Sequence, residues 1–96
     1  MGTEKSILIC EAIEKRRQLQ FMYNDKLRLV EPQLYGIGKK GSEQLRGYQV
    51  NDVPRVEKLF ELEKMKDLKM LEIGFGGPGP NYKRNDSAFK EIRCRL

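Results

Sequence analysis

Residues 19–34 read LQFMYNDKLRLVEPQL and decide the fold. Leu19, Phe21 and Tyr23 stand at every second position, which is the spacing of a strand with one buried face. Asn24-Asp25 then supplies a turn, because these short polar side chains hydrogen-bond to nearby backbone and favour one. A second strand follows from residue 27, so the stretch predicts two consecutive strands joined by a tight turn.

The second strand contains a proline. Pro32 has no backbone N–H to donate to a neighbouring strand, so we expect this strand to lie at a sheet edge or to carry a bulge. Gly36, Gly38 and Gly41 surround Lys39-Lys40 and predict the next loop. A third strand is expected after that loop.

Outside this region the chain predicts one helix and further strands. Ile9, Ala12 and Ile13 lie on one helical stripe near the N-terminus. Residues 74–80 read GFGGPGP, which combines flexible glycines with rigid prolines and predicts a loop. We expect a helix at about 6–17 and strands at about 19–24, 27–35, 44–50, 58–65, 68–73 and 89–96.

These elements predict a mainly β fold of the α+β class. A chain of 96 residues supports one hydrophobic core, so residues 1–96 are interpreted as a single domain. One N-terminal helix followed by five to six short strands favours a small, strongly curved sheet or barrel with the helix packed on one side.

Composition narrows the function. The chain carries 19 Lys or Arg against 14 Asp or Glu, and this excess lies in residues 21–50 and 81–96. It contains no histidine, so the usual general base near neutral pH is missing, and no catalytic constellation emerges from the other side chains. We therefore predict a protein that is not an enzyme, that needs no metal or cofactor, and whose charge favours an anionic partner.

The cysteines and the hydropathy indicate where in the cell the protein is expected. Cys10 and Cys94 are the only cysteines, and neither belongs to a CxxC pair. No apolar run approaches the roughly 20 residues that span a bilayer, and the short run at 7–10 lacks the features of a signal peptide. We expect a cytoplasmic protein without a membrane partner, in which both cysteines are reduced, partly buried thiols.

A spaced pattern runs through residues 12–34. Ala12-Ile13 and a basic pair end the helix, Tyr23 ends the first strand, and residues 28–34 read RLVEPQL. This arrangement resembles the opening of a WYL domain, a bacterial regulatory module, whose strand motif is Arg-x-Val-x-Pro-x-x-Leu. The resemblance covers about residues 8–70.

Two segments depart from the pattern of that family. Where the family carries its Trp-Tyr-Leu triplet, residues 43–45 read EQL, so only the leucine is retained. A later segment with two arginines corresponds to residues 58–65, KLFELEKM, which has lysine at both positions. Positive charge is kept there, but the planar fork of the guanidinium is lost.

The resemblance implies a small Sm-like, Src-homology-type barrel that senses ligands such as nucleic acid or nucleotide-derived anions. In the family such a domain is usually joined to a helix-turn-helix domain or an effector. Here we expect a separate DNA-binding or effector chain to supply that role, and transcription regulation is the process that the family suggests.

Three candidate ligand-binding residues come from the resemblance. Arg28, Lys58 and Lys64 match basic positions of the family pattern, where cations on one sheet would donate charge-assisted hydrogen bonds to phosphate oxygens. The alternative is that each is a solvated charge that keeps the domain soluble.

Four further candidates come from the strands themselves. Arg46 and Tyr48 share a strand face, and a basic residue beside an aromatic ring is a pairing that single-stranded nucleic acid binding uses. Arg93 and Arg95 share a face of the last strand and form a secondary basic surface. The alternative for Tyr48 is simple packing, and for the arginines it is surface charge.

We therefore predict a stand-alone regulatory domain that binds an anionic, nucleic-acid or nucleotide-derived ligand, single-stranded nucleic acid included. The alternative is a protein-interaction or self-association module, such as a homodimer, that docks through an exposed strand edge. Convergence of Arg28, Arg46 and Lys58 on one concave patch would favour the first hypothesis, and their scatter would favour the second.

Overall fold

The computed structural model describes residues 4–52 and 54–96. Within them, helix α1 is followed by six antiparallel strands in one curved sheet, which confirms the predicted mainly β fold with an N-terminal helix. The elements are α1 (Glu4–Lys15), β1 (Arg17–Tyr23), β2 (Lys26–Gly38), β3 (Glu43–Gln49), β4 (Val56–Glu61), the 3-10 turn η1 (Leu62–Lys64), β5 (Lys66–Gly74) and β6 (Phe89–Arg95).

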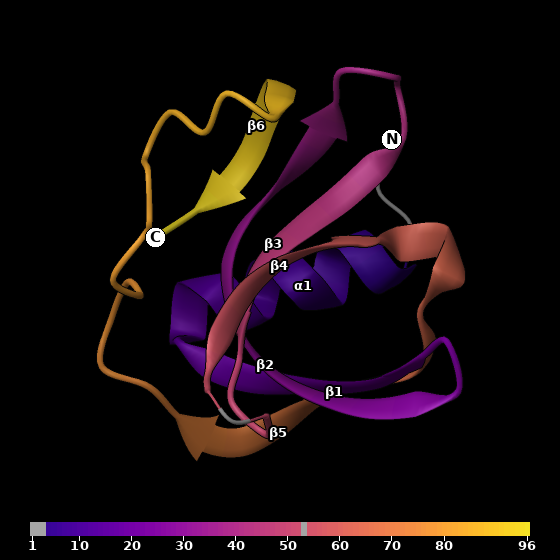
Figure 1. Ribbon diagram of the computed structural model, residues 1–96, viewed down its shortest axis with the longest axis vertical. Coiled ribbons are helices and arrows are strands. Elements are labelled where there is room, and N and C mark those ends of the chain that lie inside the picture. Colours follow the sequence, from indigo (N-terminus) through magenta and orange to yellow (C-terminus); the bar gives the residue numbers. More distant parts are fainter. Residues whose placement is uncertain (1–3, 53) are drawn as a thin grey trace.

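The long strand β2 organises the sheet. The strand order is β4-β3-β2-β1-β5, and β6 pairs with β2 beyond the end of β1. Val30 of β2 lies opposite Leu19 of β1, whereas Leu34 lies opposite Arg95 of β6. In Figure 1, β2 rises from the layer of β1 and β5 toward β6, and α1 lies in the hollow of the sheet.

β2 carries a bulge directly after its proline. The pairing of β2 with β3 shifts register between Pro32 and Leu34, which is the bulge that the proline predicts. β2 is nevertheless a central strand, flanked by β3 on one side and by β1 and β6 on the other. The bulge therefore bends the middle of the sheet rather than ending it.

Two tight turns fix the register. Asn24 and Asp25 join β1 to β2 with φ angles of 52° and 61°, the left-handed pair that matches the twist of a two-residue hairpin. At the next turn Gly41 has a φ of 91°, and the Gly38 N–H donates to the Ser42 carbonyl at 2.8 Å. The predicted loop from Gly36 onward is thus only residues 39–42, because Gly36 and Gly38 both pair with β6 and belong to β2.

The predicted strand at 58–65 is wrong over its second half. β4 ends at Glu61, and Leu62–Lys64 form η1. The Lys5 ammonium of α1 donates hydrogen bonds to the backbone carbonyls of Leu62 and Met65, at 3.0 and 2.7 Å. The alternation of apolar residues is compatible with either a strand or a 3-10 turn at residues 62–64. The hydrogen bonds from Lys5 stabilise the turn.

The core lies between α1 and the concave face of the sheet. The apolar stripe of α1, Ile9, Ala12 and Ile13, is buried as predicted. It packs against inward-facing strand and turn residues: Leu19, Phe21, Val30, Tyr35, Leu45, Phe60, Leu62 and Met65. Burying these side chains is the main favourable free-energy term for a sheet this small. Among the described residues, no helix has the length and apolar character that crossing a membrane requires.

The two cysteines form a disulfide, so the expectation of reduced thiols is wrong. Cys10 of α1 and Cys94 of β6 are bonded, with a Cα–Cα distance of 5.7 Å. Both side chains are partly buried, as expected. The pairing joins positions 84 residues apart, and it arises because β6 returns to the far half of β2, beside α1.

Candidate functional site

Arg28 lies inside the fold rather than on its surface. It is only 9% exposed, and its guanidinium donates to the Tyr23 carbonyl at 3.2 Å and to Gln49 Oε1 at 3.1 Å. Its Cζ also lies 5.7 Å from the centre of the Tyr23 ring and 6.0 Å from that of Phe60. In this geometry Arg28 ties the first hairpin to β3.

Lys58 and Lys64 lie in separate places. The Lys58 ammonium is 3.7 Å from a carboxylate oxygen of Asp52, and the Lys64 ammonium is 3.4 Å from one of Glu61. Lys58 is on β4, whereas Lys64 ends η1. The predicted basic residues Arg28, Lys58 and Lys64 are therefore not brought together into one patch.

Arg46 and Tyr48 do share the outer face of β3, but another segment covers them. The segment 75–88, here called the strap, runs along one side of the molecule from β5 to β6 (Figure 1). Asp86 of the strap accepts two hydrogen bonds from the Arg46 guanidinium, at 2.8 and 3.3 Å. A side-chain carbon at Gly79 would lie 3.4 Å from the Tyr48 ring, so the strap contacts that ring as well.

Hydrogen bonds hold the strap along its length. At its start the Phe75 N–H donates to the Arg16 carbonyl at 3.0 Å. In its middle the Gly79 N–H donates to the buried Gln33 side chain at 2.8 Å, and the Tyr82 hydroxyl donates to the Leu96 carbonyl at 2.8 Å. Near its end is the Arg46–Asp86 pair, whose side chains are only 21% and 12% exposed. The glycines and prolines of the strap form no helix or strand, as predicted.

A groove of about 540 Å³ opens beside the Arg46–Asp86 pair. Three cations line it from three parts of the chain: Lys39 from the β2–β3 turn, Arg46 from β3 and Lys83 from the strap. Glu57 of β4 and Asp86 supply its negative charge. We call this the polar groove.

The two carboxylates of the polar groove differ in acidity. Partial burial alone raises the pKa of Asp86, but the hydrogen bonds from Arg46 and from the Ala88 N–H outweigh it, and the pKa ends below its ordinary value. The pKa of Glu57 is raised, mainly by burial, with the nearby Asp86 charge adding to the effect. Glu57 is therefore the first of the two to take up a proton on acidification.

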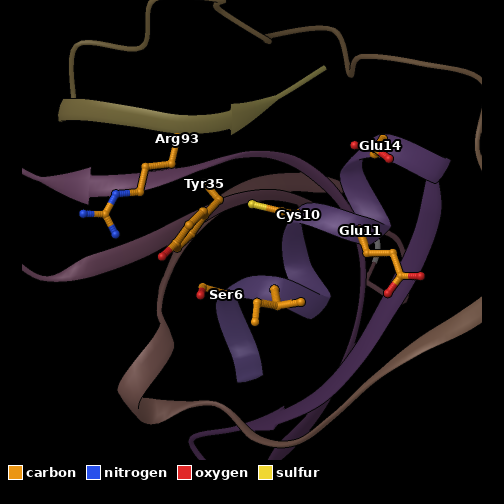
Figure 2. Close-up of a pocket in the computed structure, with 7 residues that line it drawn as sticks. Ser6, Cys10, Glu11, Glu14, Tyr35 and Arg93 are labelled. Atoms are coloured by element: carbon orange, nitrogen blue, oxygen red, sulfur yellow. The ribbon is translucent and has the colours of Figure 1, made fainter. Parts of the chain in front are cut away.

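A second groove lies between α1 and β6. It measures about 660 Å³ and is lined by Ser6, Ile7, Cys10, Glu11, Glu14, Tyr35 and Arg93. Figure 2 shows Arg93 on one side and the two glutamates on the other, with Tyr35 and Cys10 between them. We call this the helix–β6 groove.

Polar contacts fix one end of that groove. Arg93 donates to Glu91 at 2.6 Å, and the Tyr35 hydroxyl donates to the Glu43 carboxylate. Burial and the bond to Glu43 raise the pKa of Tyr35. Arg95 donates to the Arg84 carbonyl at 3.3 Å, so the predicted secondary basic surface contacts the strap through only one of its two residues.

The sequence predicts one of the three cations of the polar groove, Arg46. Its pattern indicates loop or turn positions for Lys39 and Asp86, and it gives no signal for Lys83 or Glu57. Asp86 and Arg46 are 40 residues apart in the sequence, and their pairing depends on the path of the strap. The glycines and prolines of the strap predict a loop, but they do not predict where that loop runs. The basic excess of residues 81–96 was the one signal that pointed to this segment.

Comparisons with models of protein families, with curated proteins and with solved structures find no match. The WYL resemblance therefore stays a prediction. Within residues 4–52 and 54–96, no group of three or more His, Cys, Asp or Glu side chains is arranged to hold a metal ion.

Proposed function

We propose that this chain is a non-enzymatic ligand-sensing domain that binds an anionic, nucleic-acid or nucleotide-derived ligand in the polar groove. The observation that supports the proposal is the meeting of Lys39, Arg46 and Lys83 in one concave site. Cations on separate segments can contact several oxygens of one phosphate or successive phosphates of a strand.

Asp86 has a specific role in this proposal. A carboxylate that accepts two bonds from one guanidinium occupies the position that a phosphate takes in a bidentate arginine contact. Asp86 is thus an internal competitor, and an incoming phosphate would replace it on Arg46. Moving Asp86 away also raises the net positive charge of the polar groove.

Tyr48 contributes once the strap moves. Its ring lies on the same strand face as Arg46 and is covered where the strap passes at Gly79. Displacement of the strap would expose an aromatic surface next to the arginine. A nucleic-acid base stacked there would add about 1 to 3 kcal/mol of binding free energy.

A fluorescence anisotropy titration with short single-stranded DNA and RNA at several salt concentrations tests the proposal. With three phosphate contacts we expect the logarithm of the association constant to fall with the logarithm of salt at a slope of about −2. Arg46→Gln and Lys83→Gln should each weaken binding by about fivefold, as loss of one partly exposed ionic contact predicts.

Lys26→Gln is the matched control, because it removes one positive charge at the exposed tip of the first hairpin. Lys58→Gln and Lys64→Gln remove cations that lie outside the polar groove and should behave like this control. Equal losses in all five variants would mean that only net charge attracts the nucleic acid. An absence of binding at low salt would refute the nucleic-acid version of the proposal.

Several wider predictions belong to the same proposal. They are a divergent WYL-like identity, an Sm-like description of the curved sheet, a cytoplasmic location, and a separate DNA-binding or effector chain as partner. The curved antiparallel sheet that follows an N-terminal helix supports the Sm-like description. A cytoplasmic location would place the Cys10–Cys94 disulfide among thiol reductants.

A protein-interaction or self-association module is the second candidate, and two observations favour it. Arg28, Arg46 and Lys58 do not converge, and the outer edge of β5 has no strand partner among the described residues. Ile73 near the end of β5 is 55% exposed. Such an edge is able to pair with a strand of another chain.

Sedimentation velocity over a range of concentrations tests this candidate. A dimer built on the β5 edge should dissociate in Ile73→Lys but persist in Ile7→Lys, which places the same charge on an exposed isoleucine of α1. A monomer at every concentration, with no protein partner recovered, would contradict it.

A further inference from the structure

The Cys10–Cys94 disulfide is open to solvent from two sides. Cys10 lines the helix–β6 groove, and both cysteines line a smaller groove of about 290 Å³ together with Arg93 and Arg95. Figure 2 shows the Cys10 sulfur directed toward Tyr35 inside the larger groove. A small molecule in that groove would therefore lie next to the Cys10 sulfur.

The charges around this sulfur are separated. Arg93 lies on one side of it, and Glu11 and Glu14 lie on the other (Figure 2). Glu11 is engaged by Lys15 at 2.7 Å, whereas Glu14 is exposed and has no ion pair within the part of the chain that the structure describes. The site therefore matches a ligand with a carboxylate at one end and an ammonium group at the other.

We propose that the disulfide is a reversible redox site, and that the helix–β6 groove binds a short peptide thiol, with its cysteine between its two charged ends, which reacts with Cys10. The carboxylate of this thiol would contact Arg93, its ammonium group would contact Glu14, and its sulfur would lie at Cys10.

The reaction is a thiol–disulfide exchange. The thiolate of the ligand attacks Cys10 Sγ, a new S–S bond forms between them, the Cys10–Cys94 bond breaks, and the electron pair leaves on Cys94. A second thiolate then attacks the sulfur of the bound thiol, which releases a small disulfide and leaves Cys10 as a thiolate. Two thiols are oxidised and one protein disulfide is reduced.

The surroundings favour Cys94 as the leaving group. Cys94 stands between Arg93 and Arg95 in β6, and both arginines line the smaller groove with the two cysteines and Glu14. Neighbouring cations stabilise a thiolate. A more stable thiolate leaves faster. Cys10 also lines the helix–β6 groove, where Glu11 and Glu14 of its own helix add negative charge that disfavours a thiolate. Attack at Cys10 with departure of Cys94 is therefore the favoured direction.

The experiment uses the oxidised full chain, with the tripeptide glycyl-cysteinyl-glycine as the charged thiol and 2-mercaptoethanol as the neutral thiol. The reaction is stopped with acid, remaining thiols are alkylated, and the products are mapped by peptide mass spectrometry. We expect the added thiol on Cys10 and the alkyl group on Cys94.

The ratio of the tripeptide rate to the 2-mercaptoethanol rate measures recognition, because it cancels any effect on the leaving group. We expect Arg93→Gln and Glu14→Gln each to lower this ratio by about threefold to fivefold. Lys90→Gln, an exposed cation of β6 outside the groove, should leave it unchanged. Unchanged ratios in all variants, a thiol added to Cys94, or a reaction that requires denaturant would overturn the proposal.

Discussion

Arg28 and Arg46 carry the same charge, and their surroundings give them different roles. Arg28 is held by backbone and amide oxygens beside the Tyr23 and Phe60 rings, so its guanidinium serves the packing of the first hairpin on β3. Arg46 is instead held by a carboxylate from the strap beside an open groove. The partner of an arginine therefore distinguishes a structural cation from a binding cation, and the sequence does not reveal that partner.

Arg28→Ala should lower the free energy of unfolding by about 2 to 3 kcal/mol, because it leaves the Gln49 side chain and the Tyr23 carbonyl without their donor in a buried region. Urea unfolding measures this, with Lys26→Ala as a control at an exposed neighbouring cation. Anion affinity of the folded variant should stay close to that of the wild type. A stable variant with lost anion affinity would instead place Arg28 in the ligand site.

Glu57 should make anion binding depend on pH. Burial raises its pKa, so as the pH falls from neutral toward the ordinary pKa of a glutamate, Glu57 takes up its proton while Asp86, with a lowered pKa, stays charged. The polar groove thereby loses one negative charge, and anion affinity should rise by a few-fold over that interval.

Glu57→Gln removes the charge at every pH, so it should bind more tightly at neutral pH and lose this pH dependence. Anisotropy titrations at three pH values provide the measurement, and Glu63→Gln on η1 is the control for a lost surface carboxylate. The same pH dependence in Glu57→Gln as in the wild type would contradict the assignment.

At the scale of elements, β6 is the strand whose position matters most. It pairs with the C-terminal half of β2, it follows the strap in the chain, and it places Cys94 next to Cys10 of α1. Gly36 permits this close approach, since a side-chain carbon there would lie 2.1 Å from the Glu91 carbonyl oxygen. Substitution of Gly36 would therefore displace β6.

Cys94→Ser should lower the free energy of unfolding by about 2 to 4 kcal/mol, because the disulfide closes a long loop between residues 84 apart. The hydrogen bonds of β6 to β2 remain, so the fold should persist. Urea unfolding of oxidised and reduced wild type and of the variant measures the effect, and reduced wild type should match the variant. Equal stability of all three would contradict it.

Much of the element order follows from local patterns, whereas the functional contacts do not. Alternation and the Asn24-Asp25 turn predicted the first hairpin, and the stripe at Ile9, Ala12 and Ile13 predicted the buried face of α1. These features depend on neighbours within a few residues. The disulfide and the Arg46–Asp86 pair join residues 84 and 40 positions apart, and they depend on where β6 and the strap lie.

At the scale of the whole molecule, the two grooves are connected through the C-terminal segment. The Tyr82 hydroxyl donates to the Leu96 carbonyl, and Arg95 donates to the Arg84 carbonyl, so β6 and the strap are tied together. Opening the disulfide removes the covalent link between β6 and α1, while β6 stays paired with β2. We expect this to loosen the strap, in which Asp86 contacts Arg46. The redox state should therefore influence the polar groove.

Reduction of the disulfide should raise the affinity for single-stranded DNA by about fivefold, at the lower end of typical coupling between sites. Anisotropy titrations with and without reductant measure this coupling. Cys94→Ser is the control, because it should already bind as tightly as the reduced wild type and should not respond to reductant. If reductant changes neither stability nor DNA affinity, the grooves are independent.

The central claim is that Asp86 occupies an anion site on Arg46, and the affinity of Asp86→Asn for a short single-stranded DNA tests it most directly. Asp25→Asn, at the tip of the first hairpin, is the matched control, because it makes the same change in net charge far from the groove. We expect Asp86→Asn to bind about fivefold more tightly than wild type, and Asp25→Asn to bind nearly as wild type does. Equal affinities for the two variants, or weaker binding by Asp86→Asn, would contradict the claim.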